Sequence, residues 1–452
     1  MTADRTVLPC VEPSPVFRFP DVERQVLSNG IRLWTIDHRE TKLVTFLLLL
    51  SHGSSADPKH REGLAALTAD LLDDGAGNRS GFEIHEALGR IGGTLGTDVT
   101  SDATVLSITA LSRFESEAIS LLIDIATCPR FESKEIERVR ELRQHRLAQM
   151  NQVPSIVADR TYLEAIFGDH PYGHFSIGTE TSISSITNDE VGAFHSTYFG
   201  PRQWTVIGVG ASSTRFRELA EEKFGAISFG TALKEPLEIF EPVDPVVSKK
   251  RLIVVPRPGA AQSEIRLGHL GASRNIPDFH ALLVLNMTLG GQFVSRLNLN
   301  LREDKGYTYG VGTTFDCRRG RGPFVLHAAV QSAATADALR ESINEISAIR
   351  EKRPVSESEL TAAKAALTNG FSRNFETQSQ LARAAMRLSL FQLPDDYFTE
   401  FCSRVAAVDV GAVMHAASMY LQPEKFVAVI VGSPDEFESD LGGLGFGAPV
   451  EQ

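Results

Sequence analysis

Apolar and polar positions follow two different periods along this chain. Runs of β-branched and apolar residues predict buried strands at 43–50, 204–209 and 426–431. Asn29-Gly30 separates two alternating stretches and predicts a tight hairpin turn. Elsewhere, apolar residues spaced three and four positions apart predict amphipathic helices. The two patterns together predict an α+β fold.

The expected elements fall into two similar series. In the first half, we expect helices over 61–74, 81–90, 113–127, 132–150 and 189–199, with sheet over 92–111. In the second half, we expect strands over 250–256, 263–271 and 308–331, and helices over 278–290, 333–350, 356–390 and 409–420.

Two pairs of segments show that the chain repeats itself. Residues 189–210 resemble 409–432: each has a helix, a tyrosine, a proline turn and an apolar run ending in glycine. Residues 129–150 resemble 354–375 through a proline, helix-capping residues and a long helix. Both offsets are about 220 residues, which favours a duplicated domain. We therefore predict one domain over 1–225, a proline-rich acidic linker over 226–249 and a second domain over 250–452.

Composition then narrows the class of protein. The 452 residues hold 45 Lys and Arg against 57 Asp and Glu, a net charge of -12, which argues against nucleic-acid binding. The four cysteines are too few and too scattered for a disulfide framework or a Cys-x-x-Cys site. The longest apolar run, 43–50, is too short to cross a bilayer, and the first residues do not resemble a secretory signal. We expect a cytoplasmic protein with no membrane or nucleic-acid partner.

A specific pattern in the second half points to a family. Residues 286–311 read NMTLGGQFVSRLNLNLREDKGYTYGV, which resembles the C-terminal half of the inverzincin peptidases. That family includes pitrilysin, insulin-degrading enzyme and mitochondrial processing peptidase. Segments 53–76, 170–174 and 198–210 resemble its N-terminal half, so the resemblance covers nearly the whole chain. It implies two homologous α+β domains, each a mostly antiparallel sheet packed with helices, that form half of a clam-shell chamber.

The zinc motif of the family is missing. Active members carry H-x-x-E-H on the first helix, where two His bind zinc and the Glu activates water. With the register set by Gly63, the motif positions hold Ala66, Ala69 and Asp70. The third ligand, a Glu on a later helix, corresponds best to Gln144, with Glu141 one turn away. The resemblance therefore implies no metal and no cofactor on this chain.

Two parts of the peptide-binding apparatus are retained. Family members bind the substrate as an added strand on a sheet edge, and the matching segment here is Gly92, Gly93, Thr94, Leu95 and Gly96. Their second half also supplies an Arg and a Tyr, seven residues apart, to the substrate near the zinc.

Arg302 and Tyr309 keep the spacing of that pair. Tyr307 is the alternative if the register slips by two. Arg302 could also serve only as an ion-pair partner of the neighbouring Glu303 or Asp304, with Tyr309 a strand aromatic.

These features give two functional hypotheses. In the first, the chain is inactive alone and is the non-catalytic subunit of a heterodimeric zinc metalloendopeptidase. It binds peptide in a shared chamber and supplies Arg302 and Tyr309, while zinc sits on a homologous H-x-x-E-H partner. In the second, it is a catalytically inactive peptide-binding or structural protein, such as a core subunit or a peptide-maturation partner. Neither hypothesis identifies the substrate.

Overall fold

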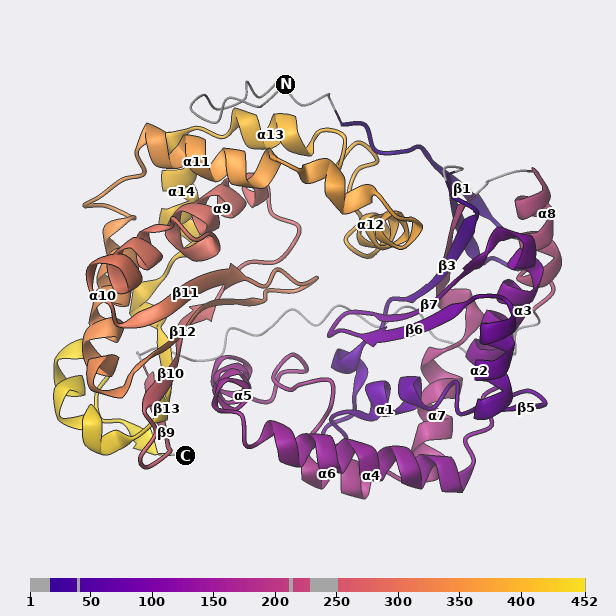
Figure 1. Ribbon diagram of the computed structural model, residues 1–452, viewed down its shortest axis with the longest axis horizontal. Coiled ribbons are helices and arrows are strands. Elements are labelled where there is room, and N and C mark those ends of the chain that lie inside the picture. Colours follow the sequence, from indigo (N-terminus) through magenta and orange to yellow (C-terminus); the bar gives the residue numbers. More distant parts are fainter. Residues whose placement is uncertain (1–16, 39–40, 211–213, 228–250, 452) are drawn as a thin grey trace, which may run out of the picture.

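Two six-stranded sheets, each packed with helices, face one another in the computed structural model (Figure 1). The structure describes residues 17–38, 41–210, 214–227 and 251–451. The α+β class with two similar halves is confirmed. Nearly all of the predicted linker, 226–249, lies outside the described residues, so the proposed domain limits stay a prediction.

The first sheet has the strand order β1-β2-β8-β3-β7-β6. Only the pair β2·β8 is parallel. Because β6 is an end strand, its outer edge has no pairing partner among the described residues. The strands are β1 (Val22–Val26), β2 (Arg32–Asp37), β3 (Leu43–Leu50), β6 (Thr94–Val99), β7 (Thr104–Leu111) and β8 (Trp204–Gly210), beside a short ribbon of β4 (Gly75–Ala76) and β5 (Arg79–Ser80).

The second sheet repeats this topology. Its order is β11-β12-β10-β13-β9-β14, and its first five strands pair with the same orientations as β6-β7-β3-β8-β2. The end strand β11 therefore corresponds to β6, as a duplicated unit requires. The strands are β9 (Arg251–Pro256), β10 (Gln262–Leu270), β11 (Thr308–Phe315), β12 (Pro323–Gln331), β13 (Val427–Gly432) and β14 (Val450–Glu451).

Helices cover the outer face of each sheet. Those of the first half bury a core that includes Phe46, Trp204 and Phe216. They are α1 (Leu64–Asp70), α2 (Gly81–Arg90), α3 (Glu115–Thr127), α4 (Ser133–Met150), α6 (Glu180–Ser185), α7 (Asn188–Tyr198) and α8 (Thr214–Lys223). Those of the second half are α9 (Phe279–Asn286), α10 (Thr335–Ala348), α11 (Glu357–Thr368), α13 (Phe401–Ala407) and α14 (Val410–Tyr420).

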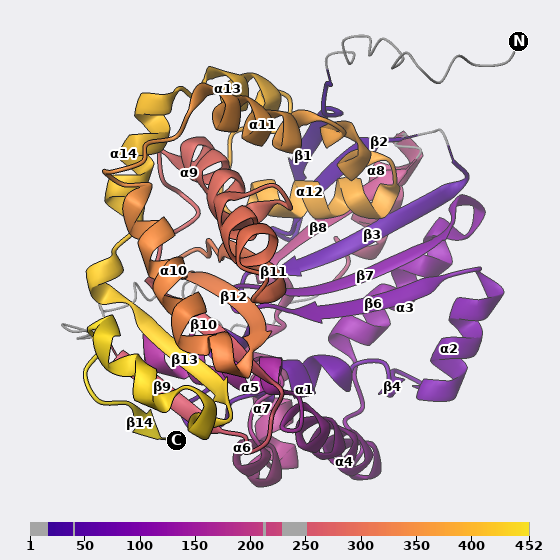
Figure 2. The same ribbon diagram turned by 60° about the vertical axis from the view of Figure 1, so that its left-hand side comes forward.

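Two further helices cross from one half to the other. α5 (Pro154–Phe167) follows the first-half helices in sequence but packs on β10 and β13 of the second sheet. α12 (Gln378–Leu390) belongs to the second half but packs on β2, β3 and β8 of the first sheet (Figure 2). Each sheet thus has its inner face covered by a helix from the opposite half.

Polar contacts hold α5 against the second sheet. The buried Tyr162 hydroxyl donates to the Phe324 carbonyl oxygen at 2.5 Å. Arg266, on β10, pairs with the Asp159 carboxylate and donates to the Ser155 carbonyl oxygen at 3.0 Å. The guanidinium of Arg266 is buried, so these partners offset the cost of removing its charge from water.

The two halves also meet at a buried carboxylate. Asp102, in the β6–β7 turn, accepts a hydrogen bond from the Tyr172 hydroxyl. It also accepts one from the Arg319 backbone N–H, in the β11–β12 loop, at 2.8 Å. The Gly320 N–H in turn donates to the Tyr172 oxygen at 3.3 Å. This contact joins corresponding turns of the two sheets.

The single helix expected over 356–390 is divided in two. Gly370 adopts the left-handed conformation with φ of 79°, which ends the first part. The Thr377 side chain caps a new helix by accepting from the Gln380 N–H. The break reorients the chain so that α12 can reach the first sheet, whereas α11 stays on its own half.

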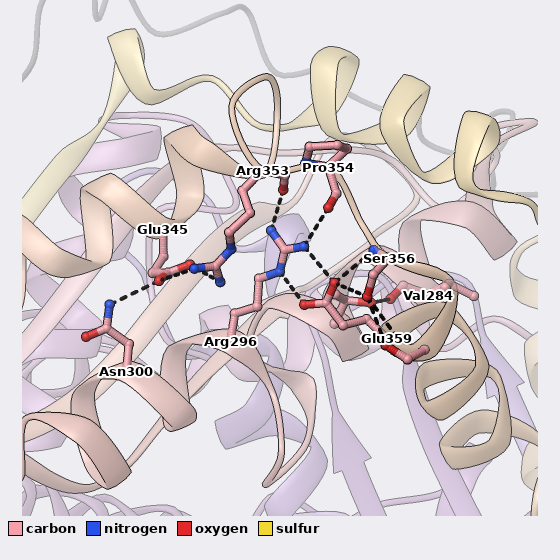
Figure 3. A network of polar contacts seen from close by, with 10 residues as sticks. Val284, Arg296, Asn300, Glu345, Arg353, Pro354, Ser356 and Glu359 are labelled. Carbon is pink, nitrogen blue, oxygen red and sulfur yellow. Dashed lines mark hydrogen bonds and ion pairs between the residues drawn. The ribbon is translucent and has the colours of Figure 1, made fainter.

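An ion pair between a buried arginine and a partly exposed glutamate anchors the segment that precedes Arg302 (Figure 3). The Arg296 guanidinium donates to both carboxylate oxygens of Glu359 at 2.6 and 2.8 Å, and to the Arg353 and Pro354 carbonyl oxygens. One turn further, Asn300 donates to Glu345 at 3.0 Å. These bonds hold η5 (Asn298–Asp304), a π-helical turn, against α10 and α11.

We expect Tyr162→Phe to lower the free energy of unfolding by about 1–3 kcal/mol, because the buried Phe324 carbonyl loses its cross-half donor. Urea unfolding of the full chain measures this. Tyr309→Phe is the matched control, since the Tyr309 side chain is exposed. Equal stability of the two variants would contradict a role for α5 in joining the halves.

We expect Glu359→Gln to cost about 2 kcal/mol at neutral pH, discounted because 32% of the Glu359 side chain stays exposed. Burial raises the pKa of this carboxyl, but hydrogen bonds from Arg296 and Ser356 outweigh burial and lower the pKa to about 2. The stabilisation is therefore present above the ordinary value of 4.5 and is lost as the pH falls toward 2.

Denaturant titrations of both proteins over this pH range provide the measurement. The stability gap between wild type and Glu359→Gln should narrow in acid. Glu357→Gln, at an exposed position in the first turn of the same helix, should show no such gap. A gap that is independent of pH would count against the ion pair as its source.

Candidate functional site

The edge strand β6 begins at a glycine turn. Gly92 has φ of 58°, a backbone conformation that favours glycine, and Gly93 donates to the Leu88 carbonyl oxygen at the end of α2. Thr94, Leu95 and Gly96 then form the first half of β6 and pair with β7 on one side. Of the five predicted peptide-binding residues, three lie on the strand and two form the turn before it.

Helix α1 is positioned beside β6 by its first residues. The Gly63 and Ala65 N–H groups donate to the two carboxylate oxygens of Asp57, each at 2.7 Å. Burial raises the pKa of the Asp57 carboxyl to about 8, although these hydrogen bonds lower it. A Cβ at Gly178 would lie 2.2 Å from the Glu62 carbonyl oxygen, so glycine permits this close backbone contact.

The degenerate motif positions of α1 lie next to β6. Ala66 and Asp70, four residues apart, line a cavity of about 450 Å³ together with the β6 residues 97–99. Ala69 is fully buried in the core of the first half. Residues of α4 and residues 175–177 complete the lining of the cavity.

Helix α4 presents arginines to this cavity. Arg143 and Arg146, three residues apart on one helix face, line it with Met150. Arg143 donates to the Asp70 carboxylate at 2.7 Å. Gln144 points elsewhere and donates to the Ser184 hydroxyl at 3.0 Å. Glu141 is exposed and does not line the cavity. The sequence reasoning thus missed both arginines.

These side chains do not fit a zinc ion. Zinc sites use Cys, His and carboxylate ligands, whereas two alanines and a guanidinium offer none. Asp70 is the single carboxylate that α1 contributes to the cavity, and it is already paired with a cation. Among the described residues, no group of three His, Cys, Asp or Glu side chains could hold a metal.

A second cavity, of about 490 Å³, lies between the two halves. It shares Asp98, Val99, Phe175 and Ser176 with the first, so the two are continuous along the end of β6. The second half contributes residues 316–318 and four residues of α12 and its end, 386–391. The interior that follows β6 is therefore built by both halves.

Arg302 and Tyr309 lie outside both cavities. The Arg302 guanidinium stacks on the Phe293 ring at 3.9 Å, and its Nη1 has no acceptor among the described residues. Its Nε lies 3.6 Å from the carboxylate of the neighbouring Glu303, so the two side chains form an ion pair. The Tyr309 side chain, on β11, is 90% exposed, whereas Tyr307 packs partly against the core.

Arg302, in η5, and Tyr309, on β11, both belong to the second half. The irregular register of β11 between Thr308 and Val311 is a bulge around Tyr309. The Asn298 side chain holds this strand, accepting from the Val311 N–H at 3.1 Å and donating to its carbonyl oxygen at 2.7 Å.

No described helix is long and apolar enough to cross a membrane.

Comparison with known proteins agrees with the fold. Residues 32–180 match the family model for insulinase (peptidase family M16), and residues 185–367 match that for the peptidase M16 inactive domain. A crystal structure of a peptidase M16 inactive domain from Pseudomonas fluorescens superimposes with a TM-score of 0.84 at 25% identity, covering 91% of this chain and 98% of that one. A protease from Helicobacter pylori, 19% identical, shares the fold with a TM-score of 0.83, over 91% and 99% of the chains.

Relatives identified by sequence also align with most of this chain. The zinc protease YmxG of Bacillus subtilis is 23% identical over 366 residues, 80% of this chain and 87% of YmxG. Mitochondrial-processing peptidase subunit alpha of Pongo abelii is 23% identical over 446 residues, 92% and 84% of the two chains. Two family models covering consecutive parts of the chain, together with these relatives, lead to one conclusion: the chain belongs to the peptidase M16 (insulinase) family.

Proposed function

We propose that this chain is the non-catalytic subunit of a heterodimeric zinc metallopeptidase. The observation that carries the proposal is the α1 corner, defined by Ala66, Ala69 and Asp70 on α1 with Arg143 on α4. The positions that the resemblance assigns to the zinc motif hold Ala66, Ala69 and Asp70, and Asp70 is paired with Arg143. Such a corner has neither the ligands nor the general base for zinc hydrolysis. The zinc site then belongs to a homologous H-x-x-E-H partner.

The second half supports a role for the chain in that partner's site. The Tyr309 side chain is exposed, and Arg302 carries an Nη1 donor without an acceptor among the described residues. A guanidinium with a spare donor and an exposed phenol are groups that can hold a peptide carbonyl or a developing oxyanion, although the Nη1 atom of Arg302 is itself buried beside Phe293. Two relatives are themselves subunits, mitochondrial-processing peptidase alpha and beta.

Peptide binding by this chain is the second part of the proposal. The free edge of β6 offers backbone N–H and C=O groups to an extended peptide, which would add as a further strand. Both cavities are lined by Asp98 and Val99 at the end of this strand, where they offer space for side chains of the added strand, whereas residues 92–96 line neither cavity. A catalytically inactive peptide-binding or structural protein is the alternative outcome of the experiments below.

Mixing the chain with a co-expressed H-x-x-E-H partner should produce peptidase activity that neither chain has alone. In that complex, we expect Arg302→Ala or Tyr309→Phe to lower kcat about 100-fold, as loss of an oxyanion donor does. Arg340→Ala, at an exposed ion pair on α10, is the control and should leave kcat unchanged.

Assembly of each variant complex is checked by size-exclusion chromatography, so that lost activity is not mistaken for lost association. Unchanged kcat/KM in both Arg302→Ala and Tyr309→Phe would contradict the assignment of this pair. A complex that forms and binds peptide but never cleaves it would favour the inactive peptide-binding protein.

The isolated chain should hold well under one zinc ion per molecule after incubation with zinc and desalting, because the α1 corner offers one paired carboxylate. Emission spectrometry measures the metal content, and an H-x-x-E-H homologue treated identically is the positive control. Stoichiometric zinc together with peptide cleavage by the isolated chain would refute the non-catalytic assignment.

A further inference from the structure

Each carboxylate that lines the two cavities already has an ion-pair or hydrogen-bond partner. Asp70 pairs with Arg143, and Asp98 lies 3.5 Å from Arg383. Asp102 accepts from the Tyr172 hydroxyl and the Arg319 N–H, and Asp316 pairs with Arg318. No acidic side chain of the lining is left to attract a cation.

Two guanidinium groups of the lining, in contrast, have no acidic partner. Arg146 on α4 and Arg387 on α12 form no ion pair or side-chain hydrogen bond in the part of the chain that the structure describes. The lining as a whole is balanced, with Asp70, Asp98, Asp102 and Asp316 against Arg143, Arg146, Arg318 and Arg387, but the charges of Arg146 and Arg387 are not paired with a carboxylate. Guanidinium groups without an acidic partner can attract an anionic ligand.

The residues around the α1 corner favour one kind of anion, a carboxylate. Arg143 and Arg146 lie on one face of α4, opposite the β6 residues 97–99. Arg143 is buried, and its guanidinium uses two acceptors, the Asp70 carboxylate and the Ile177 carbonyl oxygen, for five N–H groups. Planar guanidinium donors match carboxylate oxygens, and Met150, Phe175 and Ile177 supply apolar surface around them.

We propose that this arginine corner, defined by Arg143, Arg146 and Asp70, binds a carboxylate of the peptide that adds to β6. The inference rests on the proposed function, because it assumes that a peptide lies along this edge. The carboxylate is either the peptide's C-terminus or an acidic side chain. The arginine corner would then fix the register of the peptide that is bound along β6.

Fluorescence anisotropy on the full chain tests this with three short fluorescein-labelled peptides of alanine, serine and valine. One ends in a free carboxylate, the second in an amide, and the third in an amide after a penultimate glutamate. We expect one of the two carboxylate-bearing peptides to bind about tenfold more tightly than the plain amide. Which of them does so identifies the source of the carboxylate.

Variants of the corner separate the site from general electrostatics. Arg146→Gln should remove the tenfold preference, because it removes an unpaired guanidinium from the cavity lining. Since this exposed arginine has no side-chain partner among the described residues, its loss should not disturb the fold. Lys134→Gln removes the same charge from the same helix but outside the cavity, and should keep the preference. Asp70→Asn removes the internal competitor for Arg143 and should strengthen binding of the preferred peptide several-fold.

The outcomes distinguish this inference from the proposed function. Equal affinity for all three peptides would overturn the carboxylate site but leave peptide binding intact. A carboxylate preference that survives Arg146→Gln would equally overturn it, by placing the anion elsewhere. Absence of binding by any peptide would overturn both the arginine corner and peptide binding at β6.

Discussion

The exchange of α5 and α12 between the two halves is the constraint on which the rest of the structure depends. Each helix closes the inner face of the opposite sheet, so neither sheet is covered by its own half alone. One core cluster consequently contains Leu47 and Val209 of the first sheet with Leu267 and Leu388 of the second half. Burial of this shared apolar surface couples the folding of the halves and fixes the space between β6 and residues 316–318.

The α1 corner is positioned by residues outside the motif positions. Asp57, Gly63 and Gly178 hold α1 against β6 through backbone contacts that do not depend on the motif side chains. The corner therefore needs no His or Glu side chain at these positions to keep its place, and the Asp70–Arg143 pair lies there. A fold maintained by its backbone and core can lose one function and keep a surface suited to another.

Sequence periodicity predicted most elements well because each buries one face. The strand 43–50 and the helix 81–90 coincide with β3 and α2, and the repeat correctly predicted two sheets of like topology. The side chains of α4 that face the cavity were harder to predict. A shift of one residue on a helix turns the side chain by about 100°, so Gln144 faces α6 whereas Arg143 and Arg146 face the cavity.

The sequence by itself determined the family and the duplicated α+β unit, and it holds Ala66, Ala69 and Asp70 where the resemblance places the zinc motif, because these follow from residue identity and local pattern. Only the tertiary structure decided what lies beside those positions. Asp70 and Arg143 are 73 residues apart, and Tyr162 and Phe324 are 162 apart. Local periodicity carries no information about contacts at such separations, since they depend on how whole helices and sheets pack.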